Sequence, residues 1–185
     1  MAQIPSYISL LKCYNDKPAE VKSYFEHLPK LISDGLPYEV AIAYSFLKVE
    51  QAQNRTLYGG VVKLHRGDAQ FVGHLLNFQY LTRVGFKDIY KNVFGHPLNE
   101  ITSIKLKEAE KTRDKVIHGK SVNDNELRVA IADVLEYAEL LNQEVNLIAG
   151  FKPFSDMRGF KGRAESLDKR TTKWVMKGMG FDVKA

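Results

Sequence analysis

The chain of 185 residues contains one cysteine, Cys13, so it cannot form an internal disulfide bond. This scarcity fits a reducing compartment, and we expect a cytoplasmic location. No run of about 18 uncharged apolar residues is present, so no membrane-spanning helix is expected. The segment Met1–Lys12 also lacks the basic start and apolar run of a secretory signal. These absences predict a soluble intracellular protein.

Sequence motifs for cofactors and metals are absent as well. No glycine-rich segment has the spacing of a nucleotide- or dinucleotide-binding loop, and no serine stands in a nucleophile elbow. His65 and His74 are nine residues apart, which places them on opposite sides of a helix, so they cannot share a metal ion. The acidic residues are spread along exposed helix faces. We therefore expect neither a cofactor nor a metal site.

No segment alternates strictly between apolar and polar residues, so a β-sheet is not expected. Apolar residues instead recur at helical spacing, and an all-α fold is predicted. Helices are expected over about residues 18–34, 37–65, 68–81, 87–94, 99–119, 123–150 and 167–177. Glycine followed by a large apolar residue is expected to end helices at Gly35, Gly85, Gly150 and Gly180. The pattern leaves open whether Gly59-Gly60 breaks the second helix.

The charge of the chain predicts its division into two parts. The formal net charge is +5, and residues 151–185, with nine Lys+Arg and four Asp+Glu, hold the whole excess. We expect a helical bundle over residues 1–150, and a basic C-terminal extension with a short helix over residues 151–185. A localised basic patch indicates a polyanion partner, although a solvated tail gives the same composition.

The end of the helix expected over residues 99–119 carries the candidate catalytic residues. It reads Arg113-Asp114-Lys115-Val116-Ile117-His118-Gly119. An arginine and a histidine at this spacing are expected by chance in a chain of this composition. The position of the pair at a helix end is therefore stronger evidence for a site than the spacing itself. Histidine at a helix C-terminus is favoured as the imidazolium and can move protons near neutral pH. Because arginine binds phosphate through two nitrogen atoms, the pair has the groups needed to cleave RNA without a metal.

Helical geometry separates these two side chains. Five residues along a helix correspond to a rotation of about 140° and a rise of about 7.5 Å. Either the last turn unwinds at His118-Gly119, or a second chain completes the site. The second alternative predicts a symmetric homodimer in which two copies of the helix face each other.

This helix end and the segment after it resemble the HEPN superfamily. The shared pattern is an arginine, a polar residue, three further residues and a histidine followed by glycine, and then a polar linker and a long helix. The resemblance covers about residues 20–150 and is specific over about 105–145, with residues 126–142 matching the final helix of the family. It implies an antiparallel helical bundle, dimerisation through the motif helices and often a metal-independent endoribonuclease. In that reaction the RNA 2′-hydroxyl attacks the adjacent phosphate and leaves a cyclic phosphate end. Toxin or phage-defence roles are common in the family, which implies RNA and a cognate antitoxin protein as partners.

Carried over from the family, Arg113 and His118 are catalytic, and Asp114 orients or polarises them. The alternative is a non-catalytic domain that binds RNA or a regulatory partner. In that case Arg113 pairs with an acidic residue of a neighbouring helix, and His118 caps a helix end.

The basic extension adds candidate RNA contacts, because clustered cations neutralise phosphates. The candidate RNA-binding residues are Lys120, Arg158, Lys161, Arg163, Lys169, Arg170 and Lys173. Phe160 and Trp174 can stack on bases. In the alternative that we favour for the aromatic residues, Phe151, Phe154 and Trp174 anchor the extension to the bundle.

Overall fold

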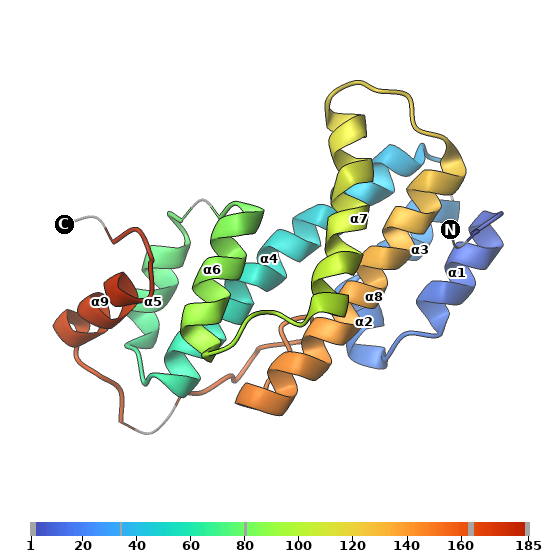
Figure 1. The fold of residues 1–185 in the computed structure, drawn as a ribbon. Helices are drawn as coiled ribbons and strands as arrows, with labels where there is room; N and C mark the ends of the chain where they lie inside the picture. The colour runs from blue at the N-terminus through green and yellow to red at the C-terminus, as the bar shows by residue number, and fades with distance from the viewer. Residues whose placement is uncertain (1–2, 34, 80, 163–164, 184–185) are drawn as a thin grey trace. The chain divides into compact units, whose positions relative to one another are not determined.

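The computed structural model describes residues 3–33, 35–79, 81–162 and 165–183. Helices are the regular secondary structure of these ranges, which contain no strand, so the predicted all-α fold is confirmed. In chain order the helices are α1 (Tyr7–Asn15), α2 (Ala19–Tyr24), α3 (Leu28–Ser33), α4 (Tyr38–Leu64), α5 (Ala69–Leu76), α6 (Arg83–Phe94), α7 (Glu100–Ile117), α8 (Asp124–Ala149) and α9 (Lys169–Gly178) (Figure 1). Within the same ranges, no helix combines the length and apolar character needed to cross a membrane.

The chain forms two compact units, each built from segments distant in sequence. The first contains Met1–Gln51, Asn99–Gln143 and Phe154–Asp156, and the second contains Ala52–Leu98, Glu144–Pro153 and Met157–Ala185. The long helices α4 and α8 contribute residues to both units. The candidate catalytic residues therefore belong to the first unit, and α9 belongs to the second.

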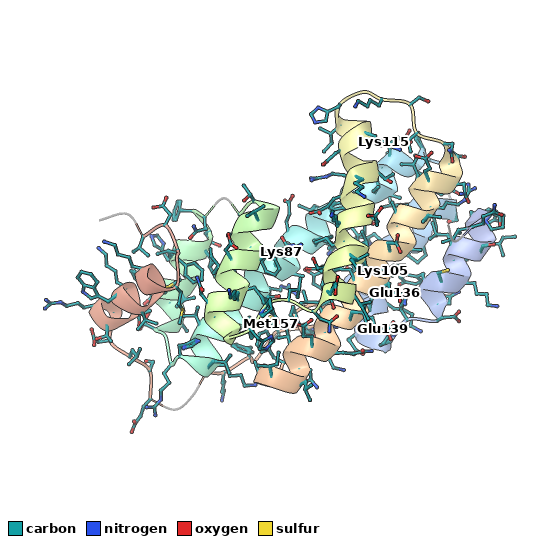
Figure 2. The ribbon with its side chains drawn as sticks, in the orientation of Figure 1. Lys87, Lys105, Lys115, Glu136, Glu139 and Met157 are labelled. Carbon is teal, nitrogen blue, oxygen red and sulfur yellow. The ribbon has the colours of Figure 1, made fainter. Side chains whose placement is uncertain are left out.

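In the first unit, α7 and α8 lie next to each other and run antiparallel (Figures 1 and 2). Lys105 Nζ lies 3.0 Å from Asp133 Oδ1, and further along α7 Lys115 Nζ lies 2.9 Å from Glu126 Oε2. Burial raises the pKa of the Asp133 carboxyl above its usual value, although the hydrogen bond from Lys105 acts in the opposite direction. The ion pair between Lys115 and Glu126 joins the C-terminal turns of α7, where the candidate residues lie, to the start of α8.

Phe154 also belongs to the core of the first unit. Asn142 on α8 donates from Nδ2 to the Phe154 carbonyl at 3.1 Å and accepts from the Phe154 amide through Oδ1 at 2.8 Å. The Phe154 ring stacks on Phe25, with 5.7 Å between the ring centroids, and meets Tyr137 edge-on. The predicted anchoring role of Phe154 is confirmed.

In the second unit, α4 continues without a break through Gly59 and Gly60, which settles the question that the sequence left open. A Cβ atom at Gly59 would lie 2.4 Å from the Phe151 ring, and one at Gly60 would lie 2.5 Å from Val93 Cγ1 on α6. Glycine is needed there for close packing, because any larger side chain would displace these neighbours. Phe151 is buried, as predicted for an anchoring residue.

The helix predicted over residues 18–34 is wrong as a single element. The structure contains α2 and α3 instead, separated by a turn at residues 25–27. Pro29 explains the break, because it has no amide hydrogen to bond the Phe25 carbonyl and its ring would clash with that carbonyl. The predicted end at residue 34 lies outside the described residues. Helix α1 was not expected at all, although Ser6 caps it by accepting a hydrogen bond from the Ser9 amide.

Two helix ends near Gly85 also differ from the prediction. Helix α5 begins after its cap Asp68, as expected, but ends at Leu76 rather than near residue 81. Gly85 lies inside the first turn of α6, where its amide donates to the Thr82 hydroxyl at 3.1 Å. The glycine therefore follows an N-terminal cap and does not end a helix. Gly35, Gly150 and Gly180 have the positive φ expected after a helix.

Helix α9 is the short helix expected in the extension, and it packs against α5. Its Thr172 hydroxyl accepts a hydrogen bond from the Asp68 amide at 2.9 Å, and the Met179 carbonyl accepts one from Asn92 Nδ2 at 3.0 Å. Trp174, by contrast, is 63% exposed. The expectation that Trp174 anchors the extension is wrong, because Thr172 and Met176 form the buried side of the helix, together with the C-cap Met179.

Candidate functional site at the end of helix α7

The last turn of α7 ends in a defined backbone arrangement. His118 is the C-cap, and Gly119 follows with a φ of +67°. The Gly119 amide donates to the Val116 carbonyl at 3.0 Å, and the Lys120 amide donates to the Lys115 carbonyl at 2.8 Å. These two bonds form a Schellman motif, in which glycine is favoured because the left-handed conformation strains any other residue. The local sequence thus determines the residue at which α7 ends and the position of His118 at that end.

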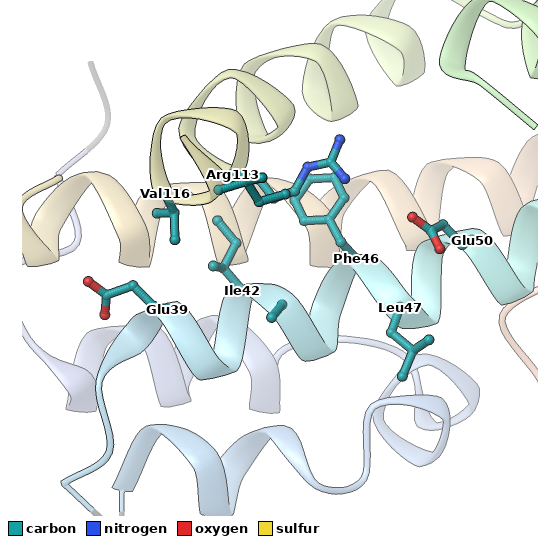
Figure 3. A pocket seen from close by; sticks show the side chains of 9 residues that line it. Glu39, Ile42, Phe46, Leu47, Glu50, Arg113 and Val116 are labelled. Atoms are coloured by element: carbon teal, nitrogen blue, oxygen red, sulfur yellow. The ribbon is translucent and has the colours of Figure 1, made fainter. Parts of the chain in front are cut away.

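Arg113 lies over an aromatic ring of α4. Its guanidinium carbon is 4.8 Å from the centroid of the Phe46 ring (Figure 3). Its Nη2 lies 3.1 Å from Asp114 Oδ1. The Nε atom is buried and makes no hydrogen bond within the described residues, while the side chain as a whole remains 26% exposed. The stacking and the ion pair fix the plane of a cation that solvent and ligands can still reach.

A pocket of about 220 Å³ opens beside Arg113 in the first unit. Its walls come from α4 and α7, and its lining residues are Glu39, Ile42, Ala43, Phe46, Leu47, Glu50, Arg113, Val116 and Ile117 (Figure 3). Pockets that enclose small-molecule cofactors are usually larger, about 300 Å³ or more. The pocket is therefore smaller than a typical cofactor site, and most of its lining residues are apolar.

His118 and Arg113 do not meet within the chain. The His118 side chain is exposed, and neither a hydrogen bond nor an ion pair joins it to Arg113 in the part of the chain that the structure describes. The helix continues regularly from Arg113 to Ile117. The rotation about the helix axis that separates the Arg113 and His118 side chains is therefore the one expected from helical geometry. In this single chain the last turn of α7 stays helical to Ile117, and His118 follows as its C-cap.

Asp114 is the acidic partner of Arg113, and it lies on the same helix rather than on a neighbouring one. Its side chain is also partly exposed. The ion pair places its carboxylate beside the guanidinium of Arg113. Among the described residues, no group of three or more His, Cys, Asp or Glu side chains is arranged to hold a metal ion.

The candidate RNA-binding residues fall into both units. Lys120 is exposed immediately after Gly119 in the first unit. In the second unit, Arg158 and Lys161 are exposed in the loop before α9. Lys169 and Arg170 are exposed on the first turn of α9, and Lys173 is half-buried on the next. Arg163 lies outside the described residues.

Several residues around the candidate site were not found from the sequence. Phe46, Glu39 and Glu50 come from α4, and they meet α7 only through the tertiary fold. On this part of α4, Val40 and Leu47 are exposed while Ile42 and Phe46 are buried. Apolar residues occur around most of this part of α4, so periodicity cannot select the side that packs.

Comparison with known proteins gives no relative on which to base an assignment. No family model, no curated protein and no solved structure matches the chain.

Proposed function

We propose that the chain is a HEPN-type endoribonuclease that cleaves RNA without a metal ion. The supporting observation is the C-terminal end of α7, where an oriented, partly exposed arginine precedes an exposed histidine. In the proposed reaction the 2′-hydroxyl attacks the adjacent phosphorus and loses its proton, while the 5′-oxygen leaves and gains one. The products are a 2′,3′-cyclic phosphate and a 5′-hydroxyl.

Each residue has a defined role in this proposal. Arg113 binds the phosphate oxygens as negative charge builds up on them in the transition state. His118 transfers the proton, because imidazole exchanges protons near neutral pH. Asp114 is a positioning residue that acts through the guanidinium of Arg113, to which it is bound at 3.1 Å.

A second copy of the chain completes the site in the proposed enzyme. Leu47 and Ile117 line the pocket beside Arg113 and are 53% and 64% exposed, so an apolar surface remains uncovered at this place. In the proposed dimer this surface is buried against another copy, and Arg113 of one chain works with His118 of the other. Toxin or defence activity, with a cognate antitoxin protein as a partner, belongs to the same proposal and follows from the sequence resemblance.

The test is cleavage of total RNA or tRNA by purified protein in the presence of EDTA. We expect wild type to produce fragments with cyclic phosphate ends, and Arg113→Ala and His118→Ala to abolish them. His27→Ala is the matched control, because His27 is an exposed histidine of the same unit, distant in sequence from α7. Equal cleavage by all variants, or none by wild type on diverse RNA, would reject the enzyme.

Mixing the two inactive variants tests whether two chains share the site. If Arg113 of one copy works with His118 of the other, each mixed dimer regains one intact site, and cleavage returns. If both residues act from the same chain, mixing restores nothing. Leu47→Lys should abolish both dimerisation, measured by sedimentation, and cleavage.

A non-catalytic RNA-binding or partner-binding domain is the second candidate. It is favoured by the fact that the contacts of Arg113 with Phe46 and Asp114, and the C-cap position of His118, suffice to explain both residues structurally. This candidate predicts RNA binding that survives His118→Ala and weakens steeply with salt, without any cleavage.

A further inference from the structure

One side of helix α9 packs against the rest of the second unit. Thr172, Met176 and Met179 are buried, and the hydrogen bond from the Asp68 amide ties Thr172 to the cap of α5. After the helix, the Gly180 amide bonds the Lys177 carbonyl and the Phe181 amide bonds the Met176 carbonyl, both at 3.1 Å. This second Schellman motif places buried Phe181 next to the end of the helix. The opposite side of α9 is therefore held in a fixed orientation.

That opposite side carries an exposed tryptophan among cations. Trp174 has Arg170 one turn before it and Lys177 one turn after it, and Lys177 Nζ lies 5.5 Å from the centroid of the indole ring. Lys173 is its sequence neighbour. We call Arg170, Lys173, Trp174 and Lys177 the α9 basic face. Residues 169–178 include no acidic residue, and no ion pair engages the three cations among the described residues.

We propose that the α9 basic face, which contains none of the candidate catalytic residues, is a binding site for single-stranded nucleic acid. One base stacks on the exposed indole, because every base has a flat π-face and stacking on aromatic side chains is tolerant of sequence. Arg170, Lys173 and Lys177 neutralise the phosphates on either side of that base. The helix rises about 10 Å from Arg170 to Lys177, so cations lie before and after the indole ring along the helix axis. In the proposed site the bound strand runs in that direction.

A membrane surface is the competing anionic partner, and the face is poorly suited to it. Helices that lie in a bilayer interface present a continuous apolar side of several large residues. Trp174 is the exposed large apolar residue of α9, whereas Met176 is buried and Val175 is half-buried. A single aromatic ring surrounded by cations matches a nucleic-acid stacking site better than an inserted helix.

The only tryptophan of the chain is Trp174, so intrinsic tryptophan fluorescence reports on this face alone. The probe is a 2′-O-methyl oligouridylate, which lacks the 2′-hydroxyl needed for the proposed cleavage. We expect saturable quenching of Trp174 fluorescence. With three phosphates neutralised, the slope of log K against log salt should be about −2, and Lys177→Ala should reduce its magnitude by about 0.7.

Anisotropy of a labelled oligouridylate compares the variants. Trp174→Ala should weaken binding about tenfold, and Trp174→Phe should retain most of the affinity. Tyr7→Ala is the matched control, because Tyr7 is an exposed aromatic residue of the other unit, and its loss should have no effect. Circular dichroism should show the same helix content in all variants.

Three results would overturn the binding site. They are unchanged affinity in Trp174→Ala, binding that does not respond to salt, and a blue-shifted Trp174 emission with phosphatidylserine vesicles but no quenching by the oligouridylate. The site does not depend on the proposed ribonuclease. Binding without cleavage by wild type would reject the proposed enzyme and support the binding site on the α9 basic face. Cleavage without quenching would support the enzyme and reject the binding site.

Discussion

The guanidinium of Arg113 lies over the ring of Phe46, with 4.8 Å between the guanidinium carbon and the ring centroid. Because the side chain is partly exposed, removing this contact in Arg113→Ala should lower the free energy of unfolding by only about 1 kcal/mol. His118→Ala removes an exposed side chain and should change it by less than about 0.5 kcal/mol. Urea denaturation of both variants measures these differences. A loss of several kcal/mol in either variant would mean that the residue is mainly structural.

Gly59→Ala should destabilise the protein, although alanine is ordinarily the better helix former by about 1 kcal/mol. The new Cβ would lie 2.4 Å from the Phe151 ring, which is itself buried and packed edge-on against Phe160. Overpacking of this kind typically costs about 1–3 kcal/mol, and we expect a net loss in thermal unfolding.

Gly178→Ala is the matched control for Gly59→Ala. Gly178 is also helical, but no atom lies within 4 Å of the position that its Cβ would occupy. This variant should be as stable as wild type or more stable by up to about 1 kcal/mol. Equal stability of the two alanine variants would show that Phe151 does not pack against α4.

Helix ends that depend on nearby residues could be predicted from the sequence. Asp68 and Asn99 cap α5 and α7 through their own side chains, and Asn123 accepts a hydrogen bond from the Glu126 amide at 3.0 Å before α8. Gly119 ends α7 through a backbone conformation that glycine favours. Each of these capping residues lies within four residues of the helix end that it determines, so the helix end can be predicted from the local sequence.

Features that depend on distant packing could not be predicted. The sequence left open whether Gly59 breaks the helix, because the Phe151 ring that requires a glycine there comes from a residue far along the chain. Trp174 was expected to anchor the extension, whereas Thr172 and Met176 are the buried residues of that helix. The candidate site divides in the same way. The end of α7 was predicted from local residues, but Phe46 beneath Arg113 became known only from the fold.

Arg128 should contribute strongly to the stability of the first unit. It is buried on α8, where its Nε donates to the Ile4 carbonyl at 2.6 Å and its Nη2 donates to the Pro5 carbonyl at 3.1 Å. Arg128→Ala leaves these carbonyls without a partner, so the free energy of unfolding should fall by about 2–3 kcal/mol. Chemical denaturation measures the loss, and limited proteolysis should show earlier cleavage near Pro5.

Arg66→Ala serves as the comparison for Arg128→Ala. Arg66 is exposed and its Nη2 lies 3.5 Å from the exposed Glu165, so its removal should cost no more than about 0.5 kcal/mol. A similar cost for both arginines would contradict the anchoring role that the buried hydrogen bonds assign to Arg128.

Helix α9 should loosen in acid because its cap is a carboxylate. Asp168 accepts hydrogen bonds from the Thr171 hydroxyl at 2.6 Å and from the Thr171 and Arg170 amides, and these bonds lower the pKa of Asp168 below its usual 3.8. An acid whose pKa is lowered by folding stabilises the helix when it is ionised. This contribution is complete above pH 3.8 and is lost as the pH falls through the lower pKa of the folded state.

Fluorescence anisotropy of Trp174 during acid titration measures this loosening, because the indole is carried by α9. Asp168→Asn keeps an oxygen acceptor at the cap but cannot titrate, so its α9 transition should disappear. Thr171→Val removes the bond that lowers the pKa most, and its transition should therefore move to higher pH, toward 3.8. An unchanged transition in Asp168→Asn would assign the acid response to another carboxyl group. Since α9 carries the proposed nucleic-acid face, oligouridylate affinity of the wild type should weaken over the same pH range.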